Sequence, residues 1–554
     1  MTYNDFEMLF KFIGGLGFFL YGMNMMADGL QKSAGNKMKK LLGFLTNNRL
    51  VAVLLGTAVT AIIQSSSATT VMVVGFVNAG LMNLTQAVGV IMGANIGTTV
   101  TAWIVSMNEL GSIFKPEFSA PLIVGIGAFL ILFANREKKR DVGEILVGFG
   151  TLFIGLSFMS AAIVPYRDAP IFSQAFRVLG EYPILAILAG TVVTGIIQSS
   201  SASVGILQTL AMNDMVTWKA AIFITLGQNI GTCVTALLSA IGTGKNAKRA
   251  AAIHLLFNVI GAVVAGVVMF VVFAVWKTFA ASLISSVEIS IFHTIFNICN
   301  TLILFPFANQ LVKLSKVLVR GTDEEEDEDE SVMVARRLDE RILETPSFAL
   351  ESVAREVVNM GNLAVNHLSI AMDALLTRSS KRVKKVRNME ETMDKLALLI
   401  TDYLVKVSSL SLTEQQHLLV NDLLNTVNDI ERIGDHCDNI GELAEKYIKE
   451  EVEFSEKAIK GLKKIYAKTI EGAENAVKAR EMLDVAAVEL TVTNEQIVDI
   501  LEEELRKDHM KRLAKKQCTA ATGVIYLDVL TNLERISDHA MNIAGYVLEE
   551  NTAS

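Results

Sequence analysis

The sequence is poor in cysteine and proline, and it lacks the common enzyme motifs. Its four cysteines form no C-x-x-C spacing, and two of them lie in apolar segments. This pattern predicts neither a disulfide framework nor a zinc site. A Ser/His/Asp set, a P-loop and a glycine-rich nucleotide fingerprint are also missing, so the sequence does not indicate an enzyme. The cysteines are Cys233, Cys299, Cys437 and Cys518.

Charged residues are scarce in the first part of the chain and abundant in the rest. With 554 residues, 51% of them hydrophobic, and a mean hydropathy of +0.42, the chain is too apolar for an ordinary soluble protein. Asp323 to Glu330 are all acidic, and such a run repels itself and marks a linker. The net charge of −8 averages two dissimilar parts, and we expect no nucleic-acid partner. We predict an all-α chain with a membrane domain, an acidic linker and a soluble domain at residues 1–320, 321–345 and 346–554.

Apolar segments in the first part predict a polytopic membrane protein, since a span needs about 20 apolar residues. Seven segments qualify, at about 6–28, 84–107, 119–135, 142–164, 216–241, 250–276 and 288–312. Basic residues cluster in alternate loops, and placing these clusters in the cytoplasm satisfies the positive-inside rule. The soluble domain is then cytoplasmic. The clusters are Lys32, Lys37, Lys39, Lys40 and Arg49; Arg136, Lys138, Lys139 and Arg140; Lys245, Lys248 and Arg249; and Lys313, Lys316 and Arg320.

Two polar motifs occur twice in this domain at one offset. GTAVTAIIQSSSA at Gly56–Ala68 returns 134 positions later as GTVVTGIIQSSSA at Gly190–Ala202, with eleven of thirteen residues identical. GANIGTTVTA at Gly93–Ala102 returns at the same offset as GQNIGTCVTA at Gly227–Ala236, with eight of ten identical. A fixed offset indicates a duplicated unit. The repeats cover about residues 50–164 and 184–312.

The apolar arms beside each QSSS run are too short to cross a bilayer alone. Each run is therefore predicted to form the tip of a re-entrant hairpin inside the membrane. Three spans separate the two hairpins, and an odd number inverts the second repeat relative to the first. Half-helices that point at a midplane site from inverted repeats are a recurring transporter layout.

No lysine or arginine lies inside the repeated motifs, so an anion there must be held by neutral donors. A broken hairpin exposes a helix N-terminus, whose free N–H groups and positive dipole end attract anions. Ser65–Ser67 and Ser199–Ser201 are expected at two such helix starts, and Gln64 and Gln198 fix the turn or touch the solute.

Glycines in the second motif are expected to unwind the helix there and to free carbonyl oxygens. With Asn95, Thr98, Asn229 and Thr232, these oxygens suit a hard monovalent cation such as sodium. The alternative is that the small residues only allow close helix packing.

The QSSS runs and the paired G-x-N-I-G-T motifs resemble the signatures of the type II sodium–phosphate cotransporters, over about residues 5–315. The resemblance implies alternating-access transport of inorganic phosphate with sodium, in a bacterial cytoplasmic membrane. The chain lacks the large extracellular loop of animal members and carries an added soluble domain, as the bacterial branch does. The resemblance places phosphate contacts at Gln64, Ser65, Ser66, Ser67, Gln198, Ser199, Ser200 and Ser201, and sodium contacts at Asn95, Thr98, Asn229 and Thr232.

The soluble domain shows six helical stretches and a duplication of its own. The stretches lie at about 347–377, 382–409, 412–449, 455–482, 486–507 and 511–548, and only Pro346 follows the linker. DIERIGDHCDNI at Asp429–Ile440 returns 103 positions later as NLERISDHAMNI at Asn532–Ile543, which predicts two three-helix units.

Each copy has a glutamate and an aspartate four residues apart, Glu431 with Asp435 and Glu534 with Asp538. This spacing places both carboxylates on one helix face, where they could bind a metal ion. The alternative is a solvated acidic face paired with arginines. These residues resemble the motifs of PhoU-type phosphate regulators, which bind metal clusters and regulate transport or signalling. His436 and His539 are weak ligand candidates. The predicted metal ligands are Glu431, Asp435, Glu534 and Asp538.

Two other functions remain open from the sequence. The membrane domain could export phosphate, or it could sense phosphate and relay the signal with little net transport. Transport direction, a homodimer and phosphate-signalling protein partners also stay open. The expected ligands are inorganic phosphate, sodium ions, the lipid bilayer and a divalent or transition metal in the soluble domain.

Overall fold

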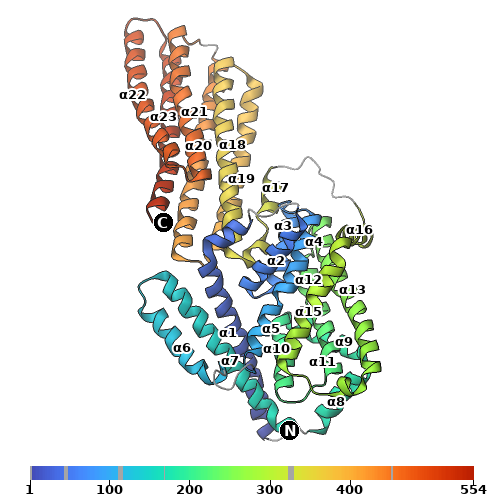
Figure 1. Ribbon diagram of the computed structural model, residues 1–554. Helices are drawn as coiled ribbons and strands as arrows, with labels where there is room; N and C mark the ends of the chain where they lie inside the picture. The colour runs from blue at the N-terminus through green and yellow to red at the C-terminus, as the bar shows by residue number, and fades with distance from the viewer. Residues whose placement is uncertain are drawn as a thin grey trace. The chain divides into compact units, whose positions relative to one another are not determined.

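The computed structural model describes residues 3–42, 48–109, 116–167, 169–321, 330–450 and 453–553. Within them every regular element is a helix, and the prediction of an all-α chain is confirmed. The chain divides into two compact units, both drawn in Figure 1. Unit 1 is Met1–Glu326 with Asp339–Phe348, and unit 2 is Asp327–Leu338 with Ala349–Ser554. The acidic run at 323–329 lies outside the described residues.

Unit 1 contains the long apolar helices and both repeated motifs. Its helices are α1 (Tyr3–Leu42), α2 (Arg49–Ile63), α3 (Ser66–Asn78), α4 (Leu84–Gly97), α5 (Thr99–Ser106), α6 (Pro116–Phe133), α7 (Glu137–Ile163), α8 (Pro170–Glu181), α9 (Pro183–Ile197), α10 (Ser200–Met212), α11 (Trp218–Gly231), α12 (Cys233–Ser239), α13 (Lys245–Val275), α14 (Lys277–Ala281), α15 (Ser286–Leu304) and α16 (Ala308–Leu318). Short 3-10 helices are η1 (Val164–Tyr166), η2 (Phe305–Phe307) and η3 (Glu340–Glu344).

Six helices among the described residues are long and apolar enough to span a membrane, or seven if the bent pair Gln174–Glu181 and Pro183–Ile197 counts as one. The predicted span at 119–135 is not among the six, because the apolar part of α6, Phe118–Phe133, is too short. At about 1.5 Å per residue it falls short of a hydrocarbon core of about 30 Å. The six are Asp5–Ala34, Leu84–Ser106, Glu137–Tyr166, Trp218–Ser239, Lys245–Val275 and Ser286–Leu318.

Helix α1 is longer than the sequence predicted. It continues to Leu42, so most of the first basic cluster is helical where we expected a loop. Lys32 Nζ lies 2.8 Å from Glu144 Oε2 of α7, and this ion pair links α1 to α7. The two helices pack closely along their length, because a Cβ added to Gly22 would lie 2.4 Å from the backbone nitrogen of Leu152.

Each QSSS run forms the tip of a helical hairpin, and the two hairpins have the same local geometry. The turn residues Gln64 and Gln198 adopt left-handed backbone conformations, with φ of 57° and 56°. The next serine caps the following helix: Ser65 Oγ accepts from the Ala68 N–H at 3.1 Å, and Ser199 Oγ from the Ala202 N–H at 3.2 Å. Such caps satisfy N–H groups that the first helical turn leaves unpaired. Identical turn chemistry thus produces identical tips.

The glycines of the second motif bring helices together and do not unwind them, so that expectation was wrong. A Cβ on Gly93 would lie 2.0 Å from the Val53 carbonyl oxygen of α2, and a Cβ on Gly227 would lie 2.0 Å from that of Ile187 in α9. The breaks fall later, at Thr98 and Thr232, where the backbone stays near helical values. Close packing of α4 on α2 and of α11 on α9 explains why only glycine fits.

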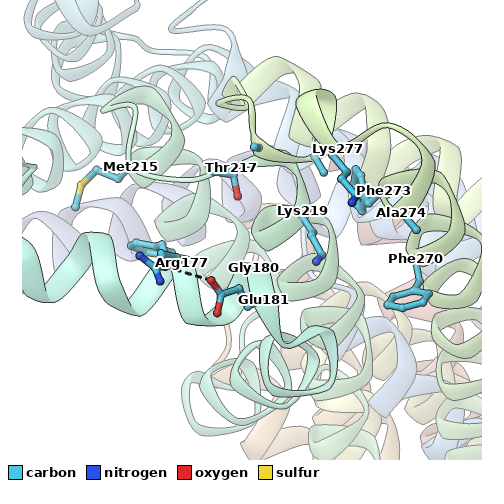
Figure 2. Close-up of a pocket in the computed structure, with 13 residues that line it drawn as sticks. Arg177, Gly180, Glu181, Met215, Thr217, Lys219, Phe270, Phe273, Ala274 and Lys277 are labelled. Carbon is cyan, nitrogen blue, oxygen red and sulfur yellow. Dashed lines mark hydrogen bonds and ion pairs between the residues drawn. The ribbon is translucent and has the colours of Figure 1, made fainter.

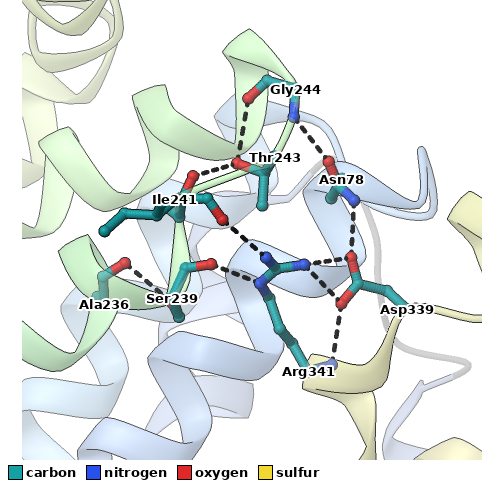
Figure 3. A network of polar contacts seen from close by, with 9 residues as sticks. Asn78, Ala236, Ser239, Ile241, Thr243, Gly244, Asp339 and Arg341 are labelled. Carbon is teal, nitrogen blue, oxygen red and sulfur yellow. Dashed lines mark hydrogen bonds and ion pairs between the residues drawn. The ribbon is translucent and has the colours of Figure 1, made fainter.

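The segment Asp339–Phe348, which overlaps the end of the predicted linker at 321–345, belongs to unit 1 (Figure 3). Asn78 at the end of α3 donates from Nδ2 to Asp339 Oδ2 at 2.7 Å, and Arg341 donates to the same carboxylate. The Arg341 guanidinium also donates to the carbonyl oxygens of Ser239 and Ile241, just where α12 ends. A cation suits the negative end of a helix. Residues 339–348 therefore join the ends of α3 and α12.

Unit 2 is a set of long helices that run side by side (Figure 1). They are α17 (Glu330–Arg337), α18 (Pro346–Thr377), α19 (Ser380–Ser408), α20 (Glu414–Lys449), α21 (Glu456–Met482), α22 (Val485–Ala514) and α23 (Ala520–Ala553). The six predicted stretches correspond to α18–α23, although α22 extends seven residues past its predicted end at 507.

The two copies of the duplication in unit 2 lie on α20 and α23, and these two helices contact each other there. His436 Nδ1 lies 2.8 Å from Asn532 Oδ1, and His539 Nδ1 lies 2.7 Å from Asp429 Oδ1 at the matching place. The imidazole rings are 5.7 Å apart. Both histidines thus bind the partner helix and not the carboxylates of their own motif.

Candidate functional site

The two hairpin tips meet in the interior of unit 1. Ser66 Oγ lies 3.3 Å from Ser200 Oγ, although 134 residues separate them. Both side chains are buried, at 2% and 7% exposure. Ser66 and Ser200 are the first residues of α3 and α10, so the positive ends of two helices converge on one place.

The neighbouring serines differ in what they can offer a ligand. The hydroxyl oxygens of Ser65 and Ser199 already accept helix N–H groups. Ser67 and Ser201 lie in the first turns of α3 and α10, where backbone N–H groups have no partner within the helix. The site therefore presents hydroxyls and N–H groups without any basic side chain from the motifs.

The two turn glutamines are in different environments. Gln64 is 3% exposed, and its Oε1 accepts from Thr101 Oγ1 of α5 at 2.9 Å. Gln198 is exposed, and the Thr235 hydroxyl at the position matching Thr101 has no hydrogen-bond partner among the described residues. A buried and bonded Gln64 is held in place, whereas Gln198 is accessible.

The predicted sodium residues lie near the ends of α4 and α11 or just after them. Thr98 Oγ1 is 3.4 Å from Ser200 Oγ, so a residue of repeat 1 touches the tip of repeat 2. Thr232 donates to the Gln228 carbonyl at 3.0 Å. Asn95 and Asn229 are 3% and 4% exposed and donate from Nδ2 to carbonyls one turn earlier in their own helices.

A separate pocket of about 610 Å³ opens between α8, α11, α13 and α14 (Figure 2). Arg177 and Glu181 of α8 form a hydrogen bond of 3.2 Å at its edge, and Lys219 and Lys277 also line it. None of the predicted site residues does. This pocket is therefore distinct from the candidate site at the hairpin tips.

Carboxylates in unit 2 gather between α19 and α20. Burial, followed by the charges of Asp394, Asp435 and Asp438, raises the pKa of Glu390 to about 8. Burial and Asp435 likewise raise the pKa of Glu431. Arg432 pairs with both motif carboxylates of α20, at 2.7 Å from Asp435 and 3.6 Å from Glu431.

A matching group lies between α22 and α23. Glu495, Asp499 and Asp538 offer oxygen atoms within 4.8 Å of one another. Burial raises the pKa of Glu495, Asp499 and Glu534, and the neighbouring carboxylates raise it further. Arg535 lies 3.4 Å from Asp538. Crowded carboxylates with raised pKa values fit a hard or borderline cation.

The sequence analysis found only half of these carboxylates. It identified the E-x-x-x-D motifs of α20 and α23 but missed those of the helices that pack on them. Glu390 and Asp394 of α19 have the same spacing as Glu495 and Asp499 of α22, 105 positions later. That second repeated spacing was the available signal.

Apolar helices long enough to span a bilayer and two broken hairpins that meet at buried serines define a membrane transport protein with a soluble helical unit. The chain belongs to the Na+/Pi-cotransporter family, whose model matches residues 18–161 and 170–298. A PhoU domain model matches residues 357–444 and 462–547.

The chain is also similar to two proteins and to one solved structure. The putative inorganic phosphate export protein YjbB of Escherichia coli is 23% identical over 545 residues, which cover 98% of both chains. The uncharacterized protein YqeW of Bacillus subtilis is 32% identical over 311 residues, 56% of this chain and 98% of its own. The crystal structure of PhoU from Pseudomonas aeruginosa aligns with 37% of this chain and 98% of its own, at 21% identity and a TM-score of 0.35.

Proposed function

We propose that the chain moves inorganic phosphate across a bacterial cytoplasmic membrane with sodium, by alternating access. The observation that carries this proposal is the contact between Ser66 and Ser200, at the N-termini of α3 and α10. Each helix end carries about half a positive charge, so two that meet in a buried place favour an anion between them. Phosphate binds there, between residues 64–67 and 198–201.

Sodium accompanies phosphate because the motif donors carry no full positive charge. A dehydrated anion of this kind needs cations as well as hydrogen bonds. Asn95, Thr98, Asn229 and Thr232 offer uncharged oxygen atoms beside the tips, as an alkali cation requires. The contact of Thr98 with Ser200 brings the two kinds of ligand within 3.4 Å.

Counterflow of labelled phosphate in proteoliposomes tests the coupling. Exchange is expected in sodium and is expected to be lost when choline replaces sodium at the same ionic strength. Phosphate exchange that ignores sodium contradicts the coupling. Phosphate binding without any exchange supports the sensor that the sequence left open.

Serine substitutions test the site itself. Ser66→Ala and Ser200→Ala each remove a hydroxyl that pairs with buried groups, a loss of about 1–3 kcal/mol, or roughly five- to hundredfold in transport. Ser315→Ala is the matched control, because Ser315 is fully buried and donates to the Val312 carbonyl in α16. Full transport in both tip variants overturns the assignment.

Export is the second candidate for direction, because the relative that covers nearly the whole chain is named as a putative phosphate export protein. Phosphate content of cells without other phosphate carriers separates the two directions. An exporter lowers internal phosphate when expressed, and an importer supports growth at limiting external phosphate.

Unit 2 regulates this transport, and its carboxylates hold a divalent or transition metal. The ligands are Glu390, Asp394, Glu431 and Asp435 in one group and Glu495, Asp499, Glu534 and Asp538 in the other. Raised carboxyl pKa values in both groups support this proposal. A bound cation stabilises the folded unit by about 2.7 kcal/mol at a concentration of 100 Kd.

Thermal unfolding of the whole protein with Mn2+, Mg2+ or EDTA tests the metal. Glu495→Gln with Asp499→Asn should lower the stabilisation, whereas Glu503→Gln with Glu504→Gln removes exposed acids of the same helix as a control. Equal metal responses in the two double variants contradict the ligand assignment.

The segment Asp339–Phe348 is the route of this regulation. Residues on both sides of it in the chain belong to unit 2, while Asp339 and Arg341 hold the ends of α3 and α12. Arg341→Ala should leave phosphate transport active but insensitive to the metal. Arg355→Ala, at an exposed arginine of α18, is the control.

A further inference from the structure

Four asparagines within the helices of unit 1 hold their amides in the same way. Each donates from Nδ2 to the carbonyl oxygen one turn earlier in its own helix, at 2.8 to 3.1 Å. Two of them, Asn95 and Asn229, belong to the repeated motifs. The other two, Asn258 of α13 and Asn297 of α15, belong to neither motif and have no role in the function proposed above.

This arrangement fixes which atom of each amide faces outward. A carbonyl oxygen cannot donate, so the atom beside it must be the Nδ2 group, and the acceptor Oδ1 points away from the helix. Asn258 and Asn297 are both fully buried, and neither Oδ1 has a partner within the described part of the chain. A buried acceptor without a donor is costly and calls for an occupant.

The two asparagines share a sequence motif. HLLFN at His254–Asn258 and HTIFN at His293–Asn297 have the same form, H-x-x-F-N. In both, the histidine is buried and one or both ring nitrogens have no partner among the residues that the structure describes. The motif thus places the same polar groups at two positions of an apolar interior.

Asn258 lies beside the broken helix of repeat 2. Its Nδ2 is 3.4 Å from Cys233 Sγ, which also lies 3.7 Å from the Asn229 carbonyl oxygen and 3.5 Å from that of His254. Cys233 is the first residue of α12 and follows the break at Thr232. The backbone of Asn229 and the side chain of Asn258 therefore contact the same cysteine.

Asn297 lies at the level of Asn95 in repeat 1. Helix α15 runs antiparallel to α4 and α5, because Ser290 bonds to the Ala102 carbonyl at 2.9 Å and Thr301 to that of Met92 at 3.5 Å. Asn95 is three residues after Met92, and Asn297 is four residues before Thr301. The two asparagines thus occupy the same turn of the packed helices.

Helices α13 and α15 also cross at this level. Asn300 donates from Nδ2 to the Phe257 carbonyl at 3.2 Å, and a Cβ on Gly261 would lie 2.3 Å from the same Nδ2. Phe257 precedes Asn258, and Asn300 is three residues after Asn297. Asn258 and Asn297 therefore both lie close to this crossing of α13 and α15.

We propose that Asn258 and Asn297 are ligands of the alkali-cation sites, the first with Asn229 in repeat 2 and the second with Asn95 in repeat 1. This inference rests on the sodium coupling proposed above and adds a helix to each site. Uncharged amide oxygens are hard ligands that replace the water around a monovalent cation without changing the net charge of the site.

Sodium titration of the purified full-length protein tests this assignment. The readout is the thermal unfolding temperature as sodium replaces choline at constant ionic strength, with lithium and potassium as comparison cations. Asn258→Leu and Asn297→Leu should each raise the half-saturating sodium concentration by roughly tenfold or more, as loss of a group that holds a metal does. Asn258→Asp and Asn297→Asp keep an oxygen and add a negative charge, so they should need no more sodium than the wild type.

Asn213→Leu is the matched control. Asn213 has the same bond to its own helix, from Nδ2 to the Thr209 carbonyl at 2.7 Å, but its Oδ1 already accepts from Ser160. This variant is expected to keep the wild-type sodium response.

The outcomes separate the two proposals. A wild-type protein that sodium does not stabilise overturns the sodium coupling itself. If the wild type responds, leucine variants with an unchanged response, or aspartate variants with a tenfold weaker one, overturn the assignment of Asn258 and Asn297. Should a leucine variant fail to fold, the aspartate variant decides for that position.

Discussion

The repeated motifs of unit 1 have nearly the same sequence and the same local structure, yet different residues hold the two hairpins. Gln64 holds the first hairpin by accepting from Thr101 of α5. In the second, Gln228 of α11 donates from Nε2 to the carbonyl oxygen and to the hydroxyl of Ser203, both at 2.9 Å. The position that matches Gln228 in repeat 1 is Ala94, which cannot form these bonds.

The duplicated motifs therefore determine the conformation of the hairpin tips, but not the hydrogen bonds that hold each hairpin to its neighbouring helix. Both hairpins keep one inner bond, between Thr60 and Thr69 at 3.0 Å and between Thr194 and Ser203 at 2.8 Å. What differs is how each hairpin is held to the helix beside it. The alternating access that we propose exchanges the conformations of two similar halves, and the unlike contacts of the two hairpins give it a testable starting point.

The glycine contacts are the shared feature whose loss should have the largest effect. Gly93→Ala and Gly227→Ala each place a methyl group 2.0 Å from a backbone carbonyl oxygen, and backbone cannot move aside cheaply. We expect a loss of about 3 kcal/mol in each case, the upper end for overpacking. Thermal unfolding and the yield of folded protein measure it.

Gly125→Ala is the control, because nothing lies within 4 Å of its added Cβ. Equal losses of stability at Gly93 and Gly227 would show that the two repeats are alike in packing energy as well as in geometry. If only one substitution is tolerated, the two repeats differ in packing energy.

The glutamines that hold the hairpins should have the next largest effect. Gln64→Ala removes the partner of Thr101, and Gln228→Ala gives repeat 2 the alanine of repeat 1. Each loses hydrogen bonds worth about 1 kcal/mol apiece and leaves buried groups unpaired. We expect both to change the sodium dependence or maximal rate of phosphate counterflow by a few-fold.

Gln64→Ala and Gln228→Ala should shift the equilibrium between the two conformations of alternating access in opposite directions, because each variant frees a different hairpin. The double variant should then lie nearer to the wild type than either single one. If the double variant shows the sum of both transport defects, the hydrogen bonds of Gln64 and Gln228 stabilise the fold and do not influence the equilibrium between conformations.

Most of this fold could be predicted from the sequence, because the spacing of apolar residues indicates the helices and the repeated motifs indicate the two hairpins. The hydrophobic period indicated α18–α23, and a fixed offset of identical residues indicated both hairpins. The role of the glycines was misjudged, because a small residue in an apolar helix is compatible with unwinding and with close packing. Only the position of Val53 against Gly93 decides between them.

Other parts of the site depend on pairings that no pattern in one chain reveals. The duplication predicted that the two QSSS runs share a site, but not that Ser66 and Ser200 are the serines that touch. No motif linked Arg341 to carbonyl oxygens about a hundred residues away. The carboxylates of α19 and α22 do share a repeated spacing, but only their packing beside α20 and α23 shows that they join the carboxylates of those helices. Such sites arise from tertiary contacts.

The smallest expected effect is a difference in access between the two turn positions. Gln198 is exposed and Gln64 is buried, and an amide that faced lipid would be costly, so the exposure of Gln198 indicates water at that tip. In a background with the exposed Cys299 replaced by serine, Gln198→Cys should react with a water-soluble thiol reagent faster than Gln64→Cys. Phosphate with sodium should slow that reaction, because the solute binds at the same tip. Equal rates at both positions would mean that the two tips share one environment, and the asymmetry would then be confined to the bonds of Gln64 and Gln228.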